Sequence, residues 1–91
     1  MKYDRSYLIW LMETCVFNRA ETAKSSLNNR RFTGYANLSD GPVRVDANYT
    51  VYPQYIIIDE ITITRGFDKH VERFVDFVIK KDSDLGEYLL H

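Results

Sequence analysis

The sequence lacks most of the features that identify a function directly. Its 91 residues include a single cysteine, which excludes an intramolecular disulfide framework and a zinc site built from cysteines. Basic and acidic residues nearly balance, 12 Lys and Arg against 13 Asp and Glu, which excludes a strongly basic nucleic-acid-binding tail. No apolar stretch approaches the roughly 20 residues of a membrane-spanning helix. With 45% hydrophobic residues the composition is ordinary for a globular protein, so disordered, collagen-like and low-complexity chains are also excluded.

The apolar run near the N-terminus is too short for a secretory signal peptide. It covers only residues 7–12, whereas the apolar part of a signal peptide has about 7–15 residues. Asp4 and Glu13 flank it, and no small-residue cleavage site follows. We therefore expect a cytoplasmic protein whose residues 1–91 form a single α+β domain.

The balanced total charge hides two halves of opposite sign. Residues 1–45 contain seven basic and four acidic side chains, and residues 46–91 contain five basic and nine acidic ones. Folding either interleaves these charges over the surface or separates them into a basic and an acidic face. The second arrangement would match a charged partner.

Helical spacing is clearest at the start of the chain. Either Asp4 or Ser6 can cap a first helix. A capping-box spacing predicts a break near Phe17 and a second helix over about 19–28, with one long helix as the alternative. The apolar positions at helical spacing, which we expect to be buried, are Leu8, Leu11, Met12 and Cys15.

Three strands are expected in the middle of the chain. Alternating residues predict strands over 31–37 and 43–52, the second with one wet face. A third strand is expected over 54–65, and its length suggests a bend or bulge near Asp59. The connections are too short for crossovers, so the sheet should be an antiparallel meander.

A last main helix is expected after Gly66, capped by Asp68 and continuing to about Lys80. Its predicted apolar face consists of Phe67, Val71, Phe74, Val75 and Val78. The apolar tail at Leu85, Tyr88, Leu89 and Leu90 should pack on the body or on a partner. The predicted fold is thus a three-stranded antiparallel sheet with one or two N-terminal helices and a C-terminal helix on one face, in the order α(α)βββα plus a short C-terminal element.

Catalytic motifs are incomplete in this chain. Residues 56–60 have the shape of a Walker B strand, but the phosphate-binding sequence Gly-x-x-x-x-Gly-Lys-Ser/Thr is absent. Asp59, Glu60, Asp68 and His70 could together bind a divalent metal, which would suit a metal-dependent hydrolase. Thr62 stands where one class of nucleases has a lysine. We expect no cofactor, no metal and no enzymatic activity, and keep the hydrolase as the least favoured alternative.

Basic and aromatic residues alternate around the first two strands, as in nucleic-acid-binding surfaces. The predicted order αβββα, Gly41-Pro42 in the first hairpin, and Lys69, His70 and Arg73 at the start of the last helix resemble the double-stranded-RNA-binding domain. Arg44 stands where that family has a histidine, and the paired lysines of its helix are missing. An RNA- or DNA-binding module is therefore an alternative function, with a site formed by Arg30, Arg31, Arg44 and Tyr49.

Our main hypothesis is a small non-enzymatic protein that binds a macromolecule, most simply another protein. In size and style the chain resembles the inhibitors and regulators encoded by phages and mobile elements, including anti-CRISPR-type proteins. The wet face of the sheet offers one binding surface, and the acidic residues of the second half offer another. A homodimer could form through the sheet edge or the C-terminal tail. The sheet-face residues are Arg44, Asp46, Asn48, Thr50 and Tyr52, and the acidic residues are Asp59, Glu60, Asp68, Glu72 and Asp76.

Overall fold

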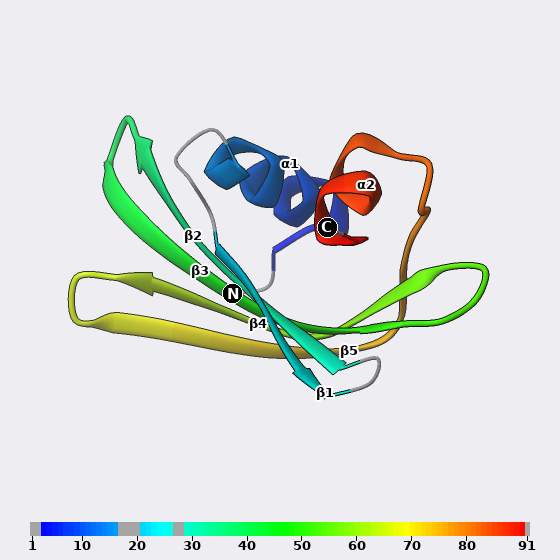
Figure 1. Cartoon of the computed structure of the whole chain (residues 1–91). Coiled ribbons are helices and arrows are strands. Elements are labelled where there is room, and N and C mark those ends of the chain that lie inside the picture. The colour runs from blue at the N-terminus through cyan, green and yellow to red at the C-terminus, as the bar shows by residue number, and fades with distance from the viewer. Residues whose placement is uncertain (1–2, 17–20, 27–28, 91) are drawn as a thin grey trace.

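The computed structural model describes residues 3–16, 21–26 and 29–90, which form two helices and a five-stranded sheet (Figure 1). The elements are α1 (Arg5–Val16), β1 (Glu21–Ser26), β2 (Asn29–Leu38), β3 (Gly41–Val51), β4 (Ile56–Arg65), β5 (Asp68–Ile79) and α2 (Asp84–Leu90). Each strand pairs antiparallel with the next one in the chain. The expected α+β class and antiparallel meander are confirmed, with a helix at the N-terminal end and a helix at the C-terminal end. The prediction of three strands is wrong, because β1 and β5 extend the sheet.

Both helices lie on the same face of the sheet (Figure 1). Their apolar side chains pack on alternate residues of the strands, which are fully buried there. Within the described ranges, neither helix is long and apolar enough to cross a membrane. The strand residues of this core are Phe32, Ala36, Val43, Val45, Ala47, Tyr49, Ile56, Ile58, Ile61, Ile63, Phe77 and Ile79.

The predicted first helix is confirmed. The first helical hydrogen bond runs from the Leu8 amide to the Asp4 carbonyl, at 3.0 Å, so Asp4 stands at the cap. The helix then contacts β2 and α2. Its buried positions are the expected Leu8, Leu11, Met12 and Cys15.

The predicted second helix is wrong for residues 21–26, which form the edge strand β1. This segment has no apolar stripe that a helix could bury, and its backbone pairs with the edge of β2 instead. The alternative of one long helix that continues to about residue 28 is wrong as well, since residues 21–26 form a strand. The proposed helix break near Phe17 lies outside the described residues.

The predicted last helix is also wrong, because residues 68–79 form β5. A two-residue hairpin loop joins β4 to β5, and Gly66 supplies the positive φ of 59° at its first position. Half of β5 is β-branched or aromatic, which favours strand. The supposed apolar helix face does not form: Phe67 is fully exposed and Val75 is 78% exposed. Asp68 therefore pairs with Arg65 across the hairpin and caps no helix.

Strands β4 and β5 carry an irregularity at matching positions. Asp59 has no ladder partner in β3 or in β5, and the register of β4 with each of these strands shifts there. This confirms the expected bulge. Opposite it, β5 has three residues, 74–76, between its ladder pairs, and Asp76 has a φ of 63°. The Arg5 guanidinium donates to the carbonyls of Val75 and Asp76, both at 2.8 Å. An α1 side chain thus satisfies backbone groups that the irregular ladder leaves free.

The short helix α2 is fixed to the sheet at its end and capped at its start. The Ser83 hydroxyl accepts a hydrogen bond from the Gly86 amide at 3.0 Å, which is N-cap geometry. The Leu89 carbonyl accepts from the Tyr49 hydroxyl at 2.8 Å and from Arg30 at 3.1 Å. The expected packing of the apolar tail on the body is confirmed, since Leu85 and Leu89 are buried.

Gly86 lies where the start of α2 meets the preceding loop. A Cβ added there would overlap the backbone carbonyl of Lys80. Backbone cannot move aside as a flexible side chain can, so this contact requires glycine.

Replacing Gly86 by alanine should destabilise the protein, although helix propensity alone favours alanine by about 1 kcal/mol. We expect overpacking of roughly 1–3 kcal/mol to dominate and to lower Tm in thermal unfolding. The matched control is Glu87→Ala, an exposed change in the same turn, expected within about 0.5 kcal/mol of wild type. A Gly86→Ala variant as stable as wild type would contradict the close packing.

Replacing Asp76 by glycine should leave the stability unchanged or raise it by up to about 1 kcal/mol, because glycine adopts positive φ without strain. The neighbouring control Val75→Gly should lower Tm, since it weakens a strand position that has no positive φ. Equal losses in the two variants, measured by chemical denaturation, would show that Asp76 is not strained.

Candidate functional site

The side chains on the uncovered side of β2–β5 form four cross-strand rows. We call this surface the open face. It is the side turned away from α1 and α2, and its residues are exposed or partly exposed. In order along the sheet, the rows are Tyr35, Arg44, Thr64 and Lys69; Thr33, Asp46, Thr62 and Val71; Arg31, Asn48, Glu60 and Arg73; and Thr50, Ile57 and Val78.

The structure places four of the five expected sheet-face residues in these rows. Arg44, Asp46, Asn48 and Thr50 occupy successive rows along β3. Tyr52 lies beyond the end of that strand, in the turn to β4, with its ring 5.5 Å from that of Tyr55. The described helices leave this whole surface accessible.

Asp46 is the electrostatic centre of the open face. Its carboxylate accepts from the Thr33 hydroxyl at 2.8 Å and from Arg44 Nε at 3.0 Å and Nη2 at 3.3 Å. Arg31 lies 3.7 Å away as a second cation. The hydrogen bond to Asp46 raises the pKa of Arg44 above its ordinary value. The Tyr35 ring, 5.8 Å from the same guanidinium, flanks it from β2.

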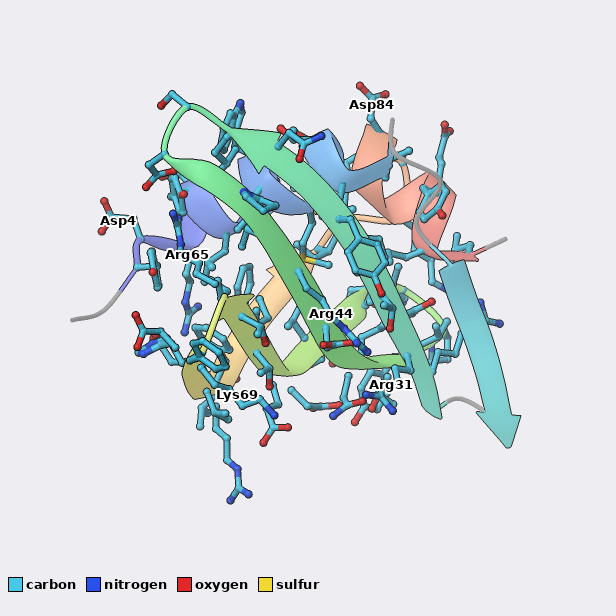
Figure 2. The ribbon with its side chains drawn as sticks, turned by 90° about the vertical axis from the view of Figure 1, so that its left-hand side faces the viewer. Asp4, Arg31, Arg44, Arg65, Lys69 and Asp84 are labelled. Carbon is cyan, nitrogen blue, oxygen red and sulfur yellow. The ribbon has the colours of Figure 1, made fainter. Side chains whose placement is uncertain are left out.

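A hollow of about 270 Å³ opens beside Asp46 on the open face. Its walls are the long cationic side chains of Arg31, Arg44 and Lys69, with Arg44 between the other two in Figure 2. The short side chains of Thr62 and Thr64 leave the space between them. Three cations against one carboxylate give this cationic hollow a net charge of two positive units.

Beyond the cationic hollow, the face carries acidic side chains held by hydrogen bonds. Glu60 accepts from Arg73 Nε at 3.0 Å and from Asn48 at 3.4 Å. Asp59, at the bulge, accepts from the Thr50 hydroxyl at 2.8 Å. The open face therefore changes from net positive at one end to mixed charge at the other.

The five expected acidic residues do not form one surface. Asp59 and Glu60 belong to the open face, whereas Glu72 lies on the helix-covered face beside His70. Asp68 begins β5, and Asp76 lies at the irregularity of that strand. Among the described residues, the basic and acidic halves of the sequence are thus interleaved.

The four residues of the nucleic-acid alternative are divided between the two faces. Arg31 and Arg44 lie on the open face, but Tyr49 is buried under α2 and Arg30 donates to the α2 carbonyls. The resemblance to the double-stranded-RNA-binding domain also loses its basis, since the segment predicted as its last helix is β5.

The residues of the hydrolase alternative are separated as well. His70 pairs in register with buried Ile63, so it lies on the helix-covered face. Glu60 lies on the other face of the sheet. There its Nε2 is 3.1 Å from the Glu72 carboxylate. The part of the chain that the structure describes contains no group of three or more His, Cys, Asp or Glu side chains that could hold a metal ion.

Sequence reasoning missed Thr62, Thr64 and Lys69. The two threonines alternate with Ile61 and Ile63, and this period of two already indicated a strand with one wet face. Lys69 was missed because it was assigned to a helix.

A second hollow, of about 360 Å³, lies beside an aromatic cluster at the start of α1. Tyr3 stacks on Tyr7 at 5.4 Å, and Trp10 follows at 5.6 Å. Arg65 and Asp40 form an ion pair of 2.7 Å in its lining, so these two charges cancel. Unlike the cationic hollow, it carries no net charge.

Comparison with known protein families, curated proteins and solved structures finds no match for this chain. The functional argument therefore depends on the geometry of the open face.

Cys15 is the one thiol of the chain, and it is completely buried in α1. Burial raises its pKa from 9.0 to about 11, because the thiolate would lose its hydration. A thiolate is the reactive form of cysteine, so both access and ionisation are suppressed.

In the folded protein at pH 8, we expect Cys15 to react with Ellman's reagent at least about a hundredfold more slowly than in denaturant, from the lower thiolate fraction alone. Stopped-flow absorbance with and without guanidinium chloride measures this ratio. Similar rates in the two conditions would show that α1 does not protect the thiol.

Proposed function

We propose that this chain is a non-enzymatic protein that binds another protein through its open face. The observation that supports this most is the cationic hollow, a group of three cations on a sheet surface that the described helices leave uncovered, two of which, Arg31 and Arg44, form ion pairs with Asp46. Charged groups held in place in this way are suited to recognition, because little side-chain entropy is lost on binding.

The composition of the open face supports a protein partner. Tyr35, Val71 and Val78 are about half exposed, at 53%, 51% and 48%, and they stand among arginines and threonines. Protein interfaces combine aromatic and arginine anchors with a polar surround in this manner.

The face is a better binding surface than the β5 edge. The irregularity at 74–76 interrupts the edge, and Lys69 and Arg73 add charge to it. Both features discourage the addition of another strand. A homodimer through this sheet edge is therefore the weaker form of the proposal.

A small protein of this kind would act by occupying a surface of its partner. The inhibitors and regulators of phages and mobile elements, to which the chain is similar in size and style, act in this general way. We propose such a role as the specific form of the function.

The nucleic-acid alternative keeps only part of its site. Arg31 and Arg44 are available, but Arg30 and Tyr49 are engaged with α2. Asp59 shares the open face and would repel a phosphate backbone, whereas Arg73 balances the charge of Glu60. This alternative is therefore an outcome of the test below.

The test compares two triple variants of the full chain as baits in native-cell extracts. Tyr35→Ala, Arg44→Ala and Val71→Ala remove side chains from the open face. Trp10→Ala, Glu13→Ala and Glu87→Ala remove side chains from the helices. We expect wild type and the helix variant to retain the same partner protein. The open-face variant should bind that partner at least about tenfold more weakly.

Quantitative mass spectrometry identifies the retained protein, titration with the purified partner gives its Kd, and circular dichroism verifies folding of both variants. A partner lost only by the helix variant would place the interface on the other side. Capture that disappears after nuclease treatment would favour the nucleic-acid alternative.

A further inference from the structure

We infer that the cationic hollow receives a single carboxylate, from an Asp or Glu side chain of the protein partner. This inference rests on the proposed function and specifies the chemistry of its site. It is supported by unused donors, by the size of the hollow and by the charge of its surroundings.

The hollow has donors that the described residues do not use. Asp46 engages Nε and Nη2 of Arg44, which leaves Nη1 free within the described ranges. Lys69 also lines the hollow, and among the residues that the structure describes no acceptor lies within hydrogen-bond distance of its ammonium group. Thr62 and Thr64 also line the hollow, and Thr64 stands between Arg44 and Lys69 in the register. A carboxylate placed here can accept from two charged donors and a hydroxyl.

Asp46 prepares the hollow for an incoming anion. It holds Arg44 through two hydrogen bonds and keeps Arg31 nearby, and it is itself only 15% exposed. One internal carboxylate leaves the hollow with a net charge of two positive units. A second carboxylate is thus attracted, and the position of Arg44 is already set by its two hydrogen bonds when it binds.

The volume of about 270 Å³ is below the range of pockets that enclose drug-sized ligands, about 300–1,000 Å³. It suits one side chain. The row of Arg31 also carries Glu60, whose charge Arg73 balances, and Asp59 lies at the bulge beyond it. A nucleic-acid strand has a phosphate at every nucleotide and would bring further negative charge to Asp59. A protein segment can instead present one isolated acid to the hollow, so the charge pattern favours the protein source.

The probe for this inference is an eight-residue peptide with one glutamate among seven glutamines, which we call the glutamate peptide, titrated into the ¹⁵N-labelled full chain and followed by NMR. An eight-residue glutamine peptide controls for backbone binding. We expect salt-dependent shifts at Thr62, Thr64 and Lys69 with the glutamate peptide only. Lys69→Gln should weaken binding about fivefold, whereas Lys80→Gln, the same charge change directly after β5, should leave it unchanged.

Three results would overturn the inference. Equal weakening by Lys69→Gln and Lys80→Gln would indicate a general attraction of the chain's positive charges to the peptide. Shifts centred away from the hollow would place the anion site elsewhere. Tighter binding of an eight-nucleotide thymidine oligomer to the same residues would assign the hollow to phosphate.

The inference and the proposed function fail in different experiments. If the open-face variant loses a protein partner but the glutamate peptide leaves the hollow unperturbed, the function stands and the inference is wrong. If the peptide binds the hollow but the open-face variant keeps every partner of wild type, the proposed function is wrong and the hollow remains a carboxylate site.

Discussion

The burial of one side of the sheet under α1 and α2 is the constraint on which the rest of the structure depends. Residues of β3 alternate strictly between the two sides, so the burial of Val45 and Ala47 places Arg44 and Asp46 on the other. In β4 and β5 the irregularities at Asp59 and at 74–76 lie opposite each other, so Ile58 and Phe77 return together to the buried side. The same alternation therefore produces the apolar core and the four polar rows.

Within those rows, short and long side chains have different roles. The threonines of β4 are short, β-branched residues that suit a half-exposed strand and leave space above it. Arginine and lysine on the neighbouring strands extend over that space, and Asp46 offsets their mutual repulsion. Because an exposed ion pair contributes little to stability, this arrangement is better understood as a means of positioning charge than as a contribution to the free energy of folding.

Much of the fold could be predicted from local pattern. The α1 stripe, the alternation in β3 and the bulge at Asp59 each depend on neighbours in the sequence. The error in β5 has a physical cause: its inward residues include Phe74, Phe77 and Ile79, and the irregularity at 74–76 inserts a helix-like step of three between the first two. Tyr49 shares the apolar side of β3 with Val45 and Ala47, so the alternation already indicated its burial. Arg30 looks like an exposed strand residue, and its hydrogen bonds to the α2 carbonyls depend on tertiary contact alone. The residues of the cationic hollow come from four strands, so they could be identified only once the register of those strands was known.

The meander also has a consequence for how the chain folds. Since every strand pairs with its sequence neighbour, forming the ladder from β2 to β5 closes only short loops and costs little chain entropy. The attachment of α2 is different, because the Leu89 carbonyl accepts hydrogen bonds from Arg30 and Tyr49, which are 59 and 40 residues away in the sequence. Rapid zipping of hairpins followed by docking of the last helix is the order of events that this topology favours, and the core is completed only at the second step.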